Sequence, residues 1–187
     1  MKLLKKQKGY TLVELLAVTA IIVIVSGLIV GILYSTLRGG NKTRIISDVT
    51  QNGNYAISVI ANTALNARSV TQVNGVPIND CTTLRQGTSI QFEEENGNLI
   101  TFACSLASQS IASTSGTTTN DLIDTSAVKV DPATCTFSCA QNNANPYSNP
   151  IIKIVFTVSQ KSNGNILENS ATSTFNTSVT MRNFSPR

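Results

Sequence analysis

The sequence predicts an α+β protein in which one long N-terminal helix packs on an antiparallel β-sheet of about four to six strands. Three observations support this fold class: an uncharged apolar run, a stretch with helical spacing of apolar residues, and a long C-terminal region of alternating β-prone runs. We therefore expect four segments along the chain. They are a basic leader (1–9), an apolar helix (10–37), an amphipathic continuation of that helix (38–68) and a β head domain (69–187).

Basic residues are concentrated in the leader. The chain has 14 Lys and Arg against 10 Asp and Glu, and four of these lysines (Lys2, Lys5, Lys6 and Lys8) lie in the first nine residues. The remainder is therefore neutral, and a basic face for nucleic acid is not expected. Because the sequence has no histidine, His-dependent catalysis and His-ligated metals are excluded. We expect no enzymatic activity, no catalytic residue and no cofactor.

The apolar run from Leu15 to Leu37 is long enough to cross a bilayer, since as a helix it spans roughly 34 Å. The four leader lysines outnumber Arg38, Lys42 and Arg44 on the far side, so the positive-inside rule places the N-terminus in the cytoplasm. The run is too long for an ordinary secretory signal peptide, and no A-x-A-like site follows it. An uncut signal anchor remains an alternative.

One carboxylate, Glu14, lies at the start of this apolar segment. A charge well inside a membrane helix costs about 2.5–3.5 kcal/mol, so such residues usually have a partner. Snorkelling of Glu14 to the membrane surface is the simpler alternative. Further along, Gly27 and Gly31 are four residues apart, a spacing that lets membrane helices approach closely.

The first 37 residues combine the basic leader MKLLKKQKG, which ends at Gly9, with aromatic Tyr10, Thr-Leu-Val-Glu14 and the apolar helix. This combination resembles the class III leader of type IV prepilins and type II secretion pseudopilins. The resemblance implies that a prepilin peptidase cuts after Gly9 and N-methylates Tyr10, where most members have phenylalanine. It also implies that Glu14 faces the Tyr10 amine of a neighbouring subunit, and that the helix has a local weak point at Gly31.

The resemblance further implies a pilin fold and a structural role as a filament subunit. The tail FNTSVTMRN resembles the last strand of minor pilins and J-type pseudopilins, which favours one of these two subunit types. The implied partners are the peptidase, sister subunits, an inner-membrane assembly platform and the membrane, with no small-molecule substrate and no nucleic acid. The implied location is the cytoplasmic membrane, and then an extracellular or periplasmic filament. The alternatives are an uncut signal-anchored surface protein or adhesin, and a competence pilin for DNA uptake.

Beyond the membrane, Gly39 and Gly40 predict a kink or short break in the helix. From Arg44 to about Arg68 apolar residues recur every three to four positions, with one gap near Gly53. The residues of this predicted apolar stripe are Ile45, Val49, Ala56, Val59 or Ile60, Ala64 and Ala67.

The clearest β signal is TSIQFEEENGNLITFAC, residues 88–104, where Asn96-Gly97 predicts a hairpin with a type I′ turn. Residues 105–126 are rich in Ser and Thr and predict a surface loop with one short strand at most. Three later strands follow, the first interrupted around Pro132. The second places Ile152, Ile154, Phe156 and Val158 on one face, and the third places Phe175, Val179 and Met181 on one face.

Two groups of acidic residues are candidate cation sites. Glu93-Glu94-Glu95 is more simply a solvated strand end, and Asp121, Asp124 and Asp131 lack the spacing of an EF-hand. We expect no metal site.

The four cysteines, Cys81, Cys104, Cys135 and Cys139, all lie in the part predicted to be outside the cytoplasm, which favours two disulfides. Three pairings exist. If residues 135–139 form a strand, Cys135 and Cys139 are roughly 13 Å apart, too far to pair with each other. If they form a turn, that pair becomes feasible. A four-cysteine zinc site lacks the C-x-x-C spacing, and free thiols would suit a reducing host.

Overall fold

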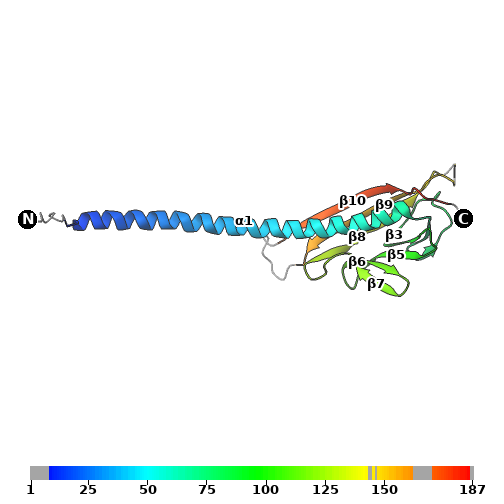
Figure 1. The fold of residues 1–187 in the computed structure, drawn as a ribbon, viewed down its shortest axis with the longest axis horizontal. Helices are drawn as coiled ribbons and strands as arrows, with labels where there is room; N and C mark the ends of the chain where they lie inside the picture. Colours follow the sequence, from blue (N-terminus) through cyan, green and yellow to red (C-terminus); the bar gives the residue numbers. More distant parts are fainter. Residues whose placement is uncertain (1–8, 143–144, 146, 162–169, 186–187) are drawn as a thin grey trace, which may run out of the picture. The chain divides into compact units, whose positions relative to one another are not determined.

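The computed structural model describes residues 9–142, 145, 147–161 and 170–185. Leader residues 1–8 lie outside the described part. The chain divides into two units, residues 1–41 and residues 42–187. One helix, α1 (Leu12–Asn66), supplies all of the described helical residues, and the remaining elements are antiparallel strands (Figure 1). The predicted α+β layout is confirmed.

Helix α1 is continuous through Gly39 and Gly40, so the predicted break is wrong. A glycine costs a helix only about 1 kcal/mol, and good helical sequence on both sides lets the hydrogen-bond ladder continue. A Cβ added at either glycine would meet no atom within 4 Å. The helix ends at Asn66, close to the expected end near Arg68.

The described residues of the second unit, 42–187, form two antiparallel sheets where the sequence predicted one. The sequence does not reveal this split, because pairing between strands far apart in the chain is set by tertiary packing. Sheet A has the order β2-β1-β4-β5-β6-β7, and sheet B has the order β10-β9-β8-β3. Their bounds are β1 Ser69–Val73, β2 Val76–Pro77, β3 Arg85–Gly87, β4 Ser89–Glu93, β5 Leu99–Ser105, β6 Ser110–Ser115, β7 Thr118–Asp121, β8 Val128–Ala140, β9 Ile151–Gln160 and β10 Thr172–Thr180.

The hairpin between β4 and β5 is confirmed, but its turn is not type I′. Only Gly97 has a positive φ, at 83°, and its N–H donates to the carbonyl of Glu94 at 3.0 Å. A type I′ turn needs positive φ at both central residues. That geometry occurs instead at Asn74 and Gly75 (φ 54° and 74°), which join β1 to β2. The same Asn-Gly signal was present there and was missed.

Residues 105–126 are not mainly a loop, because they contain the paired strands β6 and β7. Hydroxyl side chains stabilise this hairpin across the strands, as in the contact between Thr114 and Thr119 at 2.9 Å. Ile111 is fully buried, while all of β7 is exposed. The region therefore lacks the apolar alternation that would have revealed two strands.

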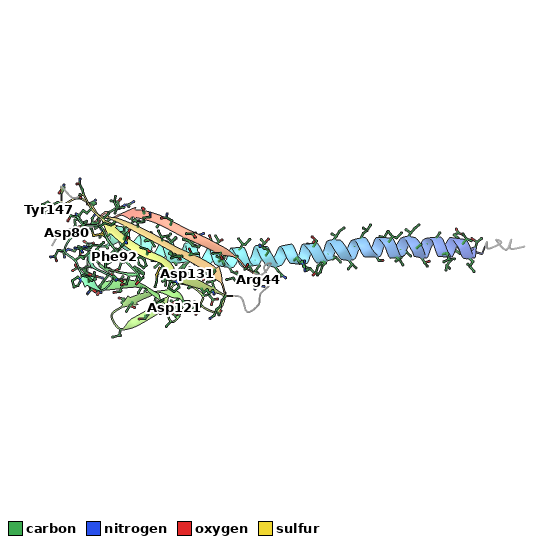
Figure 2. All side chains as sticks on the ribbon, turned by 180° about the vertical axis from the view of Figure 1, so that it is seen from behind. Arg44, Asp80, Phe92, Asp121, Asp131 and Tyr147 are labelled. Carbon is green, nitrogen blue, oxygen red and sulfur yellow. A yellow bond between two sulfur atoms is a disulfide. The ribbon has the colours of Figure 1, made fainter. Side chains whose placement is uncertain are left out.

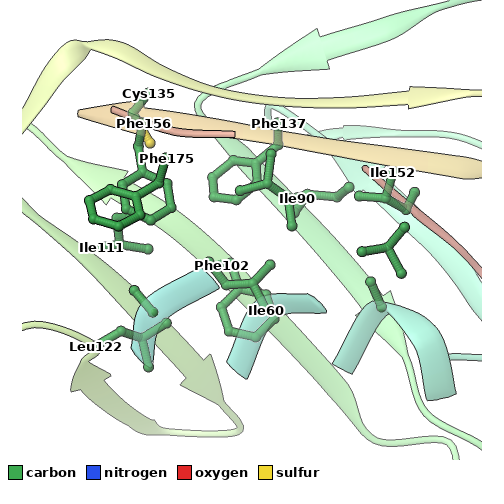
Figure 3. Packing of buried hydrophobic residues seen from close by; sticks show 14 of the residues in the cluster. Ile60, Ile90, Phe102, Ile111, Leu122, Cys135, Phe137, Ile152, Phe156 and Phe175 are labelled. Carbon is green, nitrogen blue, oxygen red and sulfur yellow. The ribbon is translucent and has the colours of Figure 1, made fainter. Parts of the chain in front are cut away.

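The core of the second unit is built from one stripe of α1 and from the inner faces of both sheets (Figure 3). The predicted stripe is confirmed, with Ile60 rather than Val59 as its central residue and Ile45 only half-buried. The expected inward faces of β9 and β10 are buried as well. Strand β8 is a single element with a register shift between Asp131 and Thr136, which matches the interruption expected around Pro132. The residues that α1 buries are Val49, Gly53, Ala56, Ile60 and Ala64.

Gly53 explains the gap in the helical pattern. It is a buried residue of α1, and a Cβ built on it would overlap the ring of Phe175 from β10. That ring is itself held in place, because it stacks on Phe156 with 5.4 Å between the ring centroids. The helix therefore lies so close to sheet B at this point that no side chain fits between them.

Two disulfides fix strand β8 to its surroundings. Cys81 pairs with Cys139, and Cys104 pairs with Cys135. The second bond joins β5 of sheet A to β8 of sheet B. The expectation of two disulfides is confirmed, and because Cys135 and Cys139 lie in one strand, they bond to separate partners.

The variant Gly53→Ala is expected to lower the free energy of unfolding by about 1–3 kcal/mol, because the added methyl must displace the Phe175 ring. Thermal unfolding of the full chain in detergent measures this change. Gly40→Ala is the matched control: its Cβ meets no atom within 4 Å, so it should leave stability unchanged or raise it through helix propensity. Equal stabilities of the two variants would contradict the close packing at Gly53.

Peptide mapping under non-reducing conditions should recover the bonds Cys81–Cys139 and Cys104–Cys135. Digestion after Phe137 is needed to separate the two cysteines of β8. Recovery of a Cys81–Cys104 bond would contradict the fold.

Replacing Cys104 and Cys135 together by Ala is expected to lower the free energy of unfolding by about 2–4 kcal/mol, because the link between the sheets is lost.

Candidate functional site: the start of the apolar helix

Residues 9–11 precede α1 and are not helical. Gly9, Tyr10 and Thr11 are all exposed, and the side chain of Tyr10 is 84% exposed. The Gly9–Tyr10 bond, where the sequence predicted cleavage, therefore lies two residues before the helix begins at Leu12.

Thr11 is the N-cap of the helix. Its hydroxyl oxygen accepts a hydrogen bond from the Glu14 N–H at 3.3 Å, and its carbonyl accepts the helical bond from the Leu15 N–H at 3.2 Å. The order Thr-x-x-Glu is the sequence signature of a capping box, in which a Ser or Thr hydroxyl bonds an otherwise unpaired amide of the first turn. This capping role was not predicted from the sequence, although the Thr-x-x-Glu motif directly precedes the apolar run.

Glu14 lies in the first turn of α1 and is exposed. A carboxylate at this position is favoured by the partial positive charge of the helix N-terminus. Among the described residues no ion pair to Glu14 is formed, and the Tyr10 nitrogen is still part of a peptide bond in the uncut chain.

The helix surface beyond Glu14 is apolar and uncovered. Every residue from Leu12 to Leu37 is exposed, and α1 is long and apolar enough to cross a membrane. A Cβ on Gly27 or Gly31 would meet nothing within 4 Å, so this small-residue face has no neighbour within the described chain. At the end of the apolar segment the Arg38 guanidinium lies 4.5 Å from the centre of the Tyr34 ring.

The aspartates considered for cation binding are instead engaged in local hydrogen bonds. Asp121 accepts from the Ser110 hydroxyl, and Asp131 accepts from the Ala133 N–H at 3.0 Å. Hydrogen bonds from Ser126 lower the pKa of Asp124. Figure 2 labels Asp121 and Asp131 together with Asp80, whose pKa is lowered by hydrogen bonds from Thr82. Within the described residues, no three Cys, Asp or Glu side chains are grouped to hold a metal ion.

The Glu93-Glu94-Glu95 run at the end of β4 is split between two roles. Glu93 accepts a hydrogen bond from the Ser69 hydroxyl at 2.9 Å. Glu94 and Glu95 line an open groove of about 770 Å³. The other lining residues are uncharged and polar, and they supply no nucleophile paired with a base. They are Asn62, Thr63, Asn66, Asn96 and Asn183.

Residues 4–30 match the family model of the prokaryotic N-terminal methylation motif. This motif is the leader of type IV prepilins, so the resemblance seen in the sequence is confirmed for this segment. The match includes Gly9, Tyr10, Thr11 and Glu14 and ends before Gly31. No curated protein and no solved structure matches the chain significantly.

Proposed function

We propose that this chain is a structural subunit of a type IV pilus or a type II secretion-like filament. One observation carries the proposal: the methylation motif of residues 4–30 leads directly into a helix whose apolar surface is uncovered. A prepilin peptidase would cut after Gly9 and methylate the new N-terminus at Tyr10. The cut chain would then polymerise through its helix.

The apolar surface from Leu12 to Leu37 must be shielded from water both before and after assembly. The bilayer covers it in the free subunit, with the N-terminus in the cytoplasm and the head domain outside. Helices of sister subunits would cover it in the filament, where Gly27 and Gly31 allow close approach. An inner-membrane assembly platform would move subunits from one environment to the other.

The charge pair between Glu14 and the Tyr10 ammonium would set the register of this assembly. Each charge is costly to bury alone, whereas together each offsets part of the other's lost hydration. Such a pair contributes little net stability, but leaving one partner unmatched costs roughly 3–5 kcal/mol. We therefore assign Glu14 to subunit alignment.

A place among the minor subunits, as a minor pilin or J-type pseudopilin, is supported by the tail sequence and by the head domain. Sheet A of that domain includes the short strand β2, and sheet B includes the short strand β3. Val76 of β2 and Leu84, just before β3, are exposed. A subunit present in few copies can carry an irregular surface, since it need not repeat along the filament.

The proposal is tested by the intact mass and N-terminal sequence of the full chain, expressed with and without a prepilin peptidase. With the enzyme, we expect a chain that begins at Tyr10 and carries one added methyl. Gly9→Leu is the control and should stay uncut, because a bulky side chain replaces the glycine beside the bond. A wild-type chain that still begins at Met1 beside an active peptidase would point to an uncut signal-anchored surface protein.

Glu14→Gln is expected to be cut normally but to enter filaments more than about tenfold less often, because the Tyr10 ammonium would be buried without a partner. Quantitative immunoblotting of sheared filaments measures the incorporation. Glu95→Gln makes the same chemical change at an exposed position of the head domain and should have no effect. Equal incorporation of both variants would contradict the role given to Glu14.

A further inference from the structure

We propose that Thr11 is a positioning residue for leader cleavage: by capping α1 it stops the helix at Leu12 and keeps the Gly9–Tyr10 bond in exposed, non-helical chain. This inference rests on the proposed function. The reaction concerned is hydrolysis of one amide bond. Water adds its oxygen to the Gly9 carbonyl carbon, and the Tyr10 nitrogen leaves as an amine that takes up a proton.

The geometry around Thr11 supports this role. The first four N–H groups of a helix have no partner within the helix, and a capping hydroxyl takes one of them. Here the Thr11 hydroxyl oxygen takes the amide of Glu14, while Gly9, Tyr10 and Thr11 remain outside the helix. The cap and the end of the helical hydrogen-bond pattern thus coincide at one residue.

Tyr10 by itself does not stop the helix. Tyrosine is an ordinary helix residue, and adding one residue to an existing helix is far easier than starting a new one. Without the cap the helix start is no longer fixed, so it can extend toward Tyr10 or fray beyond Leu12. Either change moves the Gly9–Tyr10 bond relative to the helix that anchors the substrate in the membrane.

The cap also orders the first turn, in which Glu14 lies. Because the Glu14 N–H is bonded to Thr11, the backbone of Glu14 is held three residues after the cap and four residues after the new N-terminus. Thr11 lies on the retained side of the cut, so the mature chain keeps this arrangement.

The test compares three substitutions of Thr11 in the full chain, cut by a prepilin peptidase in detergent micelles. Thr11→Val keeps the shape but removes the hydroxyl, and we expect its kcat/KM to fall roughly 3- to 10-fold. Thr11→Ser and Thr11→Asn both keep a side-chain oxygen suited to an N-cap and should cleave at close to the wild-type rate. Hydrogen exchange at the Glu14 amide, followed in the same samples, should be fast only in Thr11→Val.

Three other outcomes would contradict the positioning role of Thr11, capping as its cause, or the proposed function. If Thr11→Val is cleaved at the wild-type rate, the positioning role is contradicted, whatever the exchange rate of the Glu14 amide. Rescue by Ser without rescue by Asn assigns the hydroxyl to direct contact with the peptidase and also contradicts capping as the cause. Failure of the wild-type chain to be cut overturns the proposed function itself, and this inference with it.

Discussion

The uncovered apolar surface of α1 from Leu12 to Leu37 is the constraint on which the rest of this molecule depends. Fully burying one large aliphatic side chain stabilises by about 1.5–3 kcal/mol, so a whole helix of such residues is not left in water. A bilayer and a bundle of sister helices both satisfy this constraint. Since apolar packing is non-directional, a directional contact is needed to choose one helix alignment over another, and Glu14 lies where it can supply one.

The part of α1 in the second unit meets a different requirement. There the stripe that includes Ala56 and Ile60 is fully buried against the sheets. Gly53 brings the helix against Phe175 of sheet B, and the Cys104–Cys135 bond holds sheet A to the same sheet. These contacts hold this part of α1 against the two sheets of the second unit. One helix thus serves both as an element of a folded core and as an apolar surface for partners outside the chain.

Much of this architecture could be predicted because its signals are local. Helical spacing identified the buried stripe, and strand alternation identified the inner face that includes Ile154 and Phe156. The division into two sheets could not be predicted, since it depends on pairing between strands far apart in the chain, such as β3 and β8. The β6–β7 hairpin could not be predicted, since its strands are mostly polar. At the candidate site, the charge and apolar pattern pointed to Glu14. The role of Thr11 was missed, because a cap becomes visible only when the helix start is known to within one residue.

The most direct test of the account is whether Glu14 contacts the Tyr10 nitrogen of a different subunit. Filaments can be assembled from two pools, one labelled with ¹⁵N at Tyr10 and the other with ¹³C at the Glu14 carboxylate, and studied by solid-state NMR. The account predicts magnetisation transfer between the pools, because paired charges lie within about 4–6 Å. Transfer seen only when both labels are in one subunit would contradict it, since Glu14 would then serve its own chain.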